Sequence, residues 1–224
     1  MEQFLQNTLQ NSQDAFQKWK KIPFEERQKY FTQLSEILND RKQEFATIIT
    51  QEMNKPISQS VSEIEKCAAL CDYYATAENI LKTEQVETEF QISEIHHEPL
   101  GVILGVMPWN FPFWQAIRFA VPTILAGNVI VLKHASICEK SGETMQKIFE
   151  EAGFPKGIFT FLKVSHSQVE EMIAHPIIRG VSLTGSEAAG RKIAETAGKN
   201  LKKCVLELGG SDAFIVCEDA DLEK

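Results

Sequence analysis

Trp109 and Asn110 are the side chains whose setting most favours chemistry, because they lie in a short loop bracketed by two prolines. The loop joins an apolar run of strand character, residues 102–107, to an apolar run of helical character, residues 113–126. Proline fixes φ and removes a backbone donor, so the loop should be stiff. At the carboxyl end of a buried strand, an amide can donate a hydrogen bond to an oxygen that becomes negative during a reaction. The alternative is a rigid turn with a packed indole and no chemical role.

A lysine and a serine follow the next strand-like run, residues 128–132, in the segment Lys133-His-Ala-Ser136. The amine of Lys133 could reach ribose hydroxyls or a phosphate. Ser136 and Glu139 also have the S-x-x-E spacing of a helix capping box, which would give the serine a structural role. The two roles of Ser136 are compatible.

A glycine follows residues 179–183 in the segment Thr184-Gly-Ser-Glu187, which has the T-x-x-E spacing of a second capping box. Gly185 would let a ligand approach the backbone, and the N-terminus of the following helix would offer free N–H groups to a pyrophosphate. The sequence has no G-x-G-x-x-G motif. The Gly185 to Gly190 spacing is by itself more typical of a tight turn.

An acidic residue, Glu207, lies in the apolar run Leu206-Glu-Leu-Gly-Gly210. An acid in an apolar strand costs free energy unless it is paired or protonated. Burial raises a carboxyl pKa, so Glu207 could act as a general base near neutral pH. The alternative is a salt bridge with Lys202 or Lys203.

The elements that must position these residues alternate between buried strands and helices from Pro99 onward. Continuous apolar strands alternating with helices indicate a mostly parallel sheet covered on both faces, in a doubly wound, Rossmann-like α/β fold. The predicted helices are residues 113–126, 141–151, 168–175 and 187–197, and the predicted strands are 102–107, 128–132, 158–162, 179–183, a run from Cys204 through Glu207, and 213–216.

The first 84 residues predict N-terminal helices, because their apolar residues recur at three- and four-residue steps. Cys67 and Cys71 share one helix face, and we expect them in the core rather than on a metal. Residues 85–98 predict a half-exposed strand, with polar and apolar residues alternating from Glu89 to Ile95. Its open edge needs a cover, such as another subunit, so we expect a homo-oligomer. The predicted domains are thus N-terminal helices (1–84), an oligomerisation strand (85–98) and a nucleotide-binding domain (99–224).

Composition excludes several classes of function. The formal charge of −8 argues against nucleic-acid binding, which needs clustered Lys and Arg. No run approaches the ~20 apolar residues of a membrane span, and the N-terminus lacks the features of a secretory signal. The five cysteines are few, odd in number and set in apolar patterns, which favours a reducing cytoplasmic location.

Taken together, these motifs resemble the aldehyde dehydrogenase superfamily, in order and in spacing, from about residue 10 to the end of the chain. The segment from Lys202 to Asp212 and the Lys133-His134 pair are most similar to the succinate-semialdehyde dehydrogenase branch. The matching motifs are Glu98-Pro-Leu-Gly-Val102, Pro108-Trp-Asn-Phe-Pro112, Ala126-Gly-Asn128, Lys133, Ala152-Gly-Phe-Pro-Lys-Gly157, Leu183-Thr-Gly-Ser186 and Leu206-Glu-Leu-Gly-Gly210.

The resemblance implies that Asn110 supplies the oxyanion-hole amide for a thiohemiacetal and that Glu207 is the general base for thioester hydrolysis. It also implies an NAD(P) site and a small aldehyde substrate. Serine at position 136, where an acid would favour NAD, leaves room for a 2′-phosphate, so we expect NADP to bind, alongside NAD. The implied cofactor residues are Trp109, Asn110, Lys133, His134, Ala135, Ser136, Gly157, Gly185, Ser186 and Leu208. His134 departs from the proline that is usual in the family.

One departure concerns the nucleophile, which in the family is a cysteine a few tens of residues after the glutamate. Cys217 follows Glu207 too closely and lies in an apolar strand pattern. We therefore expect a chain without its catalytic domain, inactive alone: the cofactor-binding portion of such an enzyme. Three alternatives stay open, namely an inert dinucleotide-binding fragment, an assembly module that uses the edge of strand 85–98, and a CoA-using acylating relative.

Overall fold

The computed structural model describes residues 2–78 and 80–222. Within these residues the main sheet is parallel throughout, and its strand order is β5-β4-β3-β6-β7. The order runs outward in both directions from β3 and β6, so the chain reverses its winding between these two strands. This confirms the doubly wound α/β fold. The strands are β3 (Val102–Met107), β4 (Val129–His134), β5 (Phe159–Phe161), β6 (Ile178–Gly185) and β7 (Lys203–Leu208).

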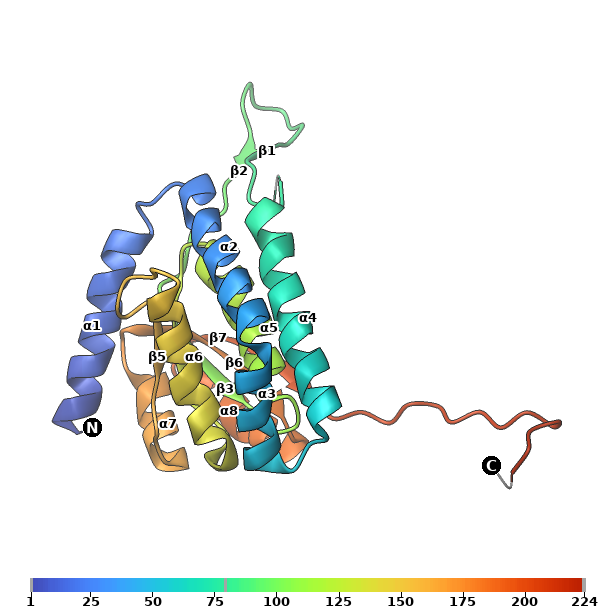
Figure 1. Ribbon diagram of the computed structural model, residues 1–224. Coiled ribbons are helices and arrows are strands. Elements are labelled where there is room, and N and C mark those ends of the chain that lie inside the picture. The colour runs from blue at the N-terminus through green and yellow to red at the C-terminus, as the bar shows by residue number, and fades with distance from the viewer. Residues whose placement is uncertain (1, 79, 223–224) are drawn as a thin grey trace.

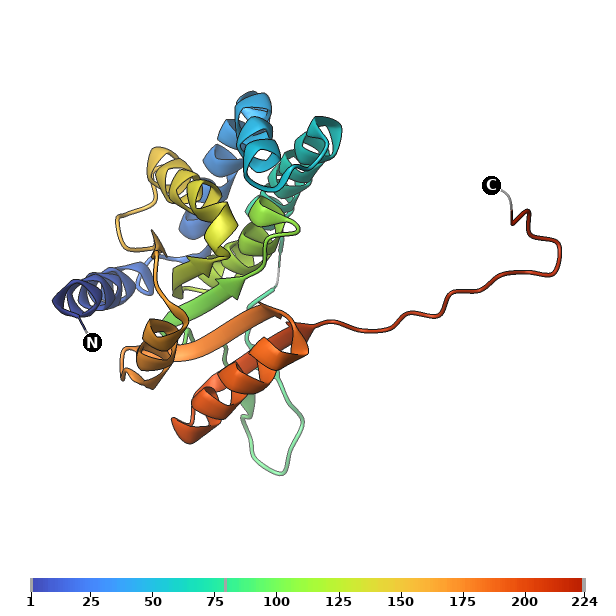
Figure 2. The same cartoon turned by 90° about the horizontal axis from the view of Figure 1, so that it is seen from below.

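Helices cover the two faces of the sheet unequally (Figure 2). On one face α5 (Pro112–Leu125) packs on β3 and β4, and α6 (Glu139–Glu151) packs on β4 and β5. On the other face α7 (His166–Ala174) packs on β6, and α8 (Glu187–Lys199) packs on β6 and β7. Contact between α5 and the sheet is close, because a Cβ at Gly105 would lie 2.5 Å from the ring of Phe119.

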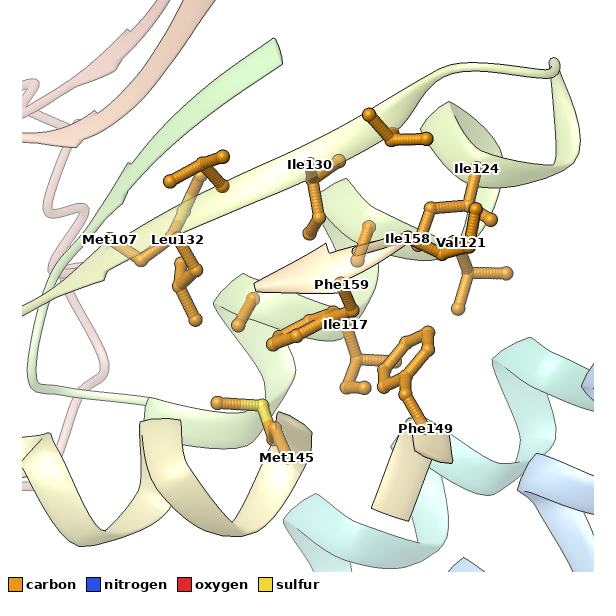
Figure 3. Close-up of a cluster of buried hydrophobic side chains, with 14 of the residues drawn as sticks. Met107, Ile117, Val121, Ile124, Ile130, Leu132, Met145, Phe149, Ile158 and Phe159 are labelled. Atoms are coloured by element: carbon orange, nitrogen blue, oxygen red, sulfur yellow. The ribbon is translucent and has the colours of Figure 1, made fainter. Parts of the chain in front are cut away.

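Part of the apolar core fills the space between the sheet and the helices α5 and α6 (Figure 3). Phe149 of α6 stacks on Phe159 of β5, with ring centroids 4.4 Å apart. Ile130 and Leu132 of β4 point into the same cluster. Burying one such side chain contributes roughly 1.5–3 kcal/mol, so this cluster holds the strand ends in fixed relative positions.

The N-terminal helices α2, α3 and α4 form an outer layer against α5 and α6, while α1 stands apart and packs on β3 and β4 of the sheet (Figure 1). Trp19 donates from Nε1 to the carbonyl of Ile124 at 2.8 Å, and Arg27 donates from Nε to the carbonyl of Leu125 at 2.8 Å. The C-terminus of α5 is therefore held by side chains of the N-terminal helices α1 and α2. The N-terminal helices are α1 (Gln3–Trp19), α2 (Phe24–Asp40), α3 (Lys42–Met53) and α4 (Ile57–Thr76).

The two cysteines of α4 confirm the core prediction, since Cys67 and Cys71 are fully buried among the apolar residues of the layer. Among the described residues, no helix combines the length and the apolar character that crossing a bilayer requires.

The strand predicted over residues 85–98 is wrong as drawn. The segment forms an arm that projects from the molecule (Figure 1), in which β1 (Glu84–Gln85) pairs antiparallel with β2 (Glu94–Ile95). Residues 87–92 between them have no strand conformation. Alternating polarity reports a preference for extended chain, but a strand forms only where a neighbour supplies hydrogen bonds.

The strand predicted over residues 213–216 is also wrong. Residues 209–222 leave the sheet as an extended segment (Figures 1 and 2), and the side chains of Phe214 and Ile215 are exposed. Cys217 is likewise exposed, not buried in a strand as its apolar neighbours suggested. Apolar character alone does not make a strand without a pairing edge.

Candidate functional site

Strand register brings the predicted site residues to one edge of the sheet. Met107 lies opposite His134, and Thr184 lies opposite Glu207. The loop after β3, the segment after β4, the turn before α8 and the end of β7 therefore share the carboxyl edge, on both sides of the reversal between β3 and β6. Ligands bind at this edge in open parallel sheets. The edge holds Trp109, Asn110, Lys133, Ser136, Gly185, Ser186, Glu207 and Leu208.

Gly157 does not belong to this edge. It precedes β5, at the amino end of the strand, and has a φ of +90°. A Cβ there would lie 2.9 Å from the Cβ of Ala15 and 3.1 Å from the carbonyl of Asn11, both in α1. The glycine is thus explained by packing against α1, and its place in a cofactor groove stays a prediction.

The Trp109–Asn110 loop is exposed but firmly held. The indole of Trp109 is 53% exposed. The carbonyl of Asn110 accepts a hydrogen bond from Nζ of Lys55 at 3.0 Å, and a carboxylate oxygen of Glu63 accepts from the N–H groups of Phe113 (2.9 Å) and Trp114 (3.0 Å). Side chains of Lys55 and Glu63 therefore fix the backbone of the loop, while the Trp109 indole stays exposed at the surface.

Sequence reasoning missed Lys55 and Glu63. The signal was present, since Glu63 lies on the buried face of α4 beside Ile64 and Cys67. A carboxylate on the apolar face of a helix must have a partner, because an unpaired buried charge is costly.

His134 faces inward, towards α5. Its Nε2 lies 2.8 Å from the carbonyl of Pro112 and its Nδ1 lies 2.8 Å from the N–H of Ala135. A neutral ring with its proton on Nε2 satisfies both contacts, since Nε2 then donates and Nδ1 accepts. Burial lowers the pKa of His134 to about 4. Both ring nitrogens are thus engaged by the loop and by Ala135, and the predicted contact of residue 134 with a cofactor stays a prediction.

Lys133 precedes this histidine on β4 and is also largely buried. Burial lowers the pKa of its amine, and Glu139 partly offsets the effect. Strand alternation points it to the face opposite α5.

Both predicted capping boxes are wrong. Ser136 begins a short 3-10 turn, η1 (Ser136–Cys138), and the N-terminus of α6 is capped instead by Glu52 of α3, which accepts from the N–H of Lys140 at 2.6 Å. The cap of α8 is Ser186, whose hydroxyl accepts from the N–H of Ala189 at 3.3 Å. Ser136 is exposed at the carboxyl edge.

Glu207 has a different environment from the one expected. Its side chain is about half exposed, and both carboxylate oxygens accept hydrogen bonds from Arg118 of α5. These bonds lower its pKa, so the prediction of a raised value is wrong. Arg118 takes the place of the expected lysine partner, and Nζ of Lys202 donates instead to the carbonyl of Ile178 at 2.7 Å.

A cavity of about 360 Å³ lies beside this ion pair, between α5 and the open face of β6 and β7. Its lining is largely apolar and includes Met107, Arg118, Phe119, Thr184, Val205 and Glu207. Leu208 projects to the opposite face, where a Cβ at Gly190 of α8 would lie 2.7 Å from its methyl groups.

The inward-facing ring of His134 predicts a pH-dependent stability. Its folded pKa of about 4 lies below the ordinary 6.5, so the unfolded chain binds more protons between these values. The free energy of unfolding should fall by up to about 3 kcal/mol as pH drops from 6.5 to 4. Urea denaturation at a series of pH values measures this. His134→Asn should flatten the profile in this window, whereas exposed His166→Asn should not; equal slopes in all three proteins would contradict the assignment.

Comparison with known proteins places this arrangement in a family. The profile described as "Aldehyde dehydrogenase family" matches residues 2–224. A Synechocystis protein named probable succinate-semialdehyde dehydrogenase [NADP(+)] is 46% identical over 96% of this chain and 48% of its own length. An Escherichia coli protein named succinate semialdehyde dehydrogenase [NAD(P)+] is 44% identical over 98% of this chain and 48% of its own length.

A solved structure of succinic semialdehyde dehydrogenase from Streptococcus pyogenes, in complex with NADP+, superposes with a TM-score of 0.94 at 41% identity. The match covers 100% of this chain and 50% of that one. The chain thus spans about half the length of the relatives it matches. The family match over nearly every residue and the shared fold lead to one conclusion: this chain belongs to the aldehyde dehydrogenase family.

Proposed function

We propose that this chain is the dinucleotide-binding portion of an NAD(P)-dependent aldehyde dehydrogenase whose substrate is a small aldehyde with a carboxylate, succinate semialdehyde being the best candidate. The observation that carries the proposal is the meeting of four strand ends at one carboxyl edge, with an amide, a lysine, a serine and a carboxylate. The names of the relatives support the substrate and the cofactor.

The residues of this edge fit a dinucleotide. The N-terminus of α8 follows Gly185 and Ser186 and offers its N–H groups to a pyrophosphate. Lys133 and Ser136 follow β4 and would hold the adenosine ribose, with the backbone of Ala135 between them. The nicotinamide, when bound, supplies the hydride acceptor. The close approach of Leu208 to Gly190 keeps α8 tight against β7, beside this site.

Asn110 and Glu207 would act on the aldehyde. The amide of Asn110 would donate to the oxygen that becomes negative when a thiol adds to the carbonyl, a contact worth roughly 3–4 kcal/mol. Because its pKa is lowered, Glu207 is ionised near neutral pH and can accept a proton from water once Arg118 is drawn away. The ion pair with Arg118 therefore keeps the Glu207 carboxylate deprotonated.

The cysteines of the described residues argue against a nucleophile in this chain. The nucleophile must be a thiolate. Burial raises the pKa of Cys138, the cysteine of η1, to about 12. Burial also raises the pKa values of Cys67, Cys71 and Cys204. Cys217 lies on the extended segment that leaves the sheet. We infer that the 224-residue chain binds dinucleotide without oxidising aldehyde.

The exposed hydroxyl of Ser136 predicts that NADP binds with an affinity less than tenfold below that of NAD, because no carboxylate there repels a 2′-phosphate. Isothermal titration of the chain measures both affinities. Ser136→Glu should weaken NADP relative to NAD by about tenfold or more, a difference of ~1.4 kcal/mol. Gln33→Glu, an exposed position on α2, should leave the ratio unchanged.

Tenfold weaker binding of NADP than of NAD by the unaltered chain would contradict this prediction. The same samples, given NADP and succinate semialdehyde, should show no absorbance increase at the wavelength of NADPH. Aldehyde-dependent NADPH formation by the chain would refute the inert description.

Arg118 predicts the class of substrate, since it is a guanidinium in the lining of an otherwise largely apolar cavity. A substrate carboxylate could replace Glu207 on this fork, because Arg binds carboxylates bidentately. Succinate should therefore perturb the NMR signals of the Glu207 side chain. Arg118→Gln should weaken succinate binding at least about tenfold, in line with the loss of a charged hydrogen bond. Arg191→Gln on α8 is the control, and equal binding by both variants would exclude Arg118 from recognition.

A second function, assembly, is favoured by the arm between β1 and β2. Val86, Phe90, Ile92 and Ile95 expose 40–75% of their surface there, an unusual density of apolar side chains on a projection. We propose that a second copy of the chain covers the arm, as expected of a homo-oligomer.

Replacing Phe90 and Ile92 together by Asp should dissociate this assembly, because burying two charges in an apolar contact is unfavourable. Sedimentation equilibrium measures the change in mass. Gln91→Asp adds a charge between them and should have a smaller effect. An unaltered chain that remains monomeric at high concentration would exclude the arm as an assembly element of this chain.

A further inference from the structure

Lys55 and Glu63 form an ion pair inside the protein, between the start of α4 and the loop that precedes it. The ammonium nitrogen lies 2.6 Å from a carboxylate oxygen, and the two side chains are 6% and 0% exposed. A buried pair is often no more stable than apolar residues of the same volume. The pair is therefore better explained by the other groups that the two charged side chains bind than by the attraction between the charges.

The two charged side chains bind the backbone of the Trp109–Asn110 loop and of the first turn of α5. Glu63 accepts from the N–H groups of Phe113 and Trp114 in the first turn of α5. Lys55 donates to the carbonyl of Asn110, and its ammonium lies 3.6 Å from the ring centroid of Phe111. Four residues between 110 and 114 thus contact one ion pair. The peptide unit that begins at the carbonyl of Asn110 cannot rotate without breaking the bond to Lys55.

We propose that Lys55 and Glu63 are positioning residues that set the direction in which the Asn110 amide and the Trp109 indole project from the carboxyl edge. This inference rests on the proposed role of Asn110 in the aldehyde site. The pair touches neither substrate nor cofactor; it acts through the loop. The alternative is a purely structural pair that joins α4 to α5 and has no effect on the loop's orientation.

The protein contains a matched control. Lys42 of α3 and Glu65 of α4 form a second Lys–Glu pair with the same 2.6 Å separation. This pair lies on the exposed surface of α3 and α4. Loss of this pair removes an ion pair from α4 without touching the loop. Surface pairs contribute about 0–1 kcal/mol, so the control should fold normally.

The test compares the double variant Lys55→Met, Glu63→Leu with the double variant Lys42→Met, Glu65→Leu in the full 224-residue chain. Three quantities are measured: the free energy of unfolding in urea, the hydrogen-exchange rates of the Phe113 and Trp114 amides, and the NMR signals of the Asn110 side-chain amide and the Trp109 indole N–H. The NMR signals report the orientation of the loop itself. The exchange rates report the bonds that Glu63 accepts, so a role confined to joining α4 to α5 would change the first two quantities and leave the NMR signals unchanged.

We expect the buried double variant to stay folded, with the two amides exchanging at least about tenfold faster through local opening and with shifted or broadened Asn110 and Trp109 signals. The control should match the unaltered chain in all three. Unchanged loop signals in a folded buried variant would overturn the proposal, as would equal changes in both variants. If the double variant does not fold, Glu63→Gln, which keeps the side-chain volume, is read by the same signals with the same two outcomes.

NADP titration of these variants separates this inference from the proposed function. If the unaltered chain binds no dinucleotide, the proposed function fails, yet the loop signals still decide whether Lys55 and Glu63 orient Asn110. If dinucleotide binds and the loop signals do not respond to loss of the pair, the proposed function stands and the positioning role is overturned.

Discussion

The constraint on which the structure depends is that a loop at the tip of a strand must be rigid although no neighbouring strand pairs with it. The loop between β3 and α5 meets this constraint with side chains from other elements. Its backbone carbonyls accept from Lys55 and His134, and the first turn of the helix donates to Glu63. A polar backbone group left without a partner inside a protein costs about 1–3 kcal/mol, so these contacts act together to select one loop conformation.

The architecture was predictable because it follows from local patterns. Apolar strands alternate with amphipathic helices, and in a parallel doubly wound sheet the carboxyl ends of all strands must share one edge. Knowing where each strand stops was therefore enough to bring Asn110, Lys133, Ser186 and Glu207 together. The helix boundaries differ from expectation by only a few residues for the same reason.

The details that failed depend on partners distant in the sequence. Glu207 was expected to be protonated more easily, but Arg118, on a helix 89 positions earlier, reverses the direction of its pKa shift. The N-terminus of α6 is capped by Glu52 rather than by a local serine. Neither Arg118 nor Glu52 lies in a sequence pattern that indicates its partner. Residues 213–216 show the converse case, an apolar run that pairs with no strand among the described residues.

Helix α5 is held at both ends by side chains of the N-terminal helices. Glu63 binds its first turn, while Trp19 and Arg27 bind the carbonyls of its last turn. A helix clamped in this way can neither slide along its axis nor tilt by itself. Asn110 just before the helix and Arg118 within it must therefore move as one rigid body. The distance between Asn110 and Arg118 is consequently set by the rise of the helix and not by the flexibility of either side chain. A molecule that contacts both residues must match this distance.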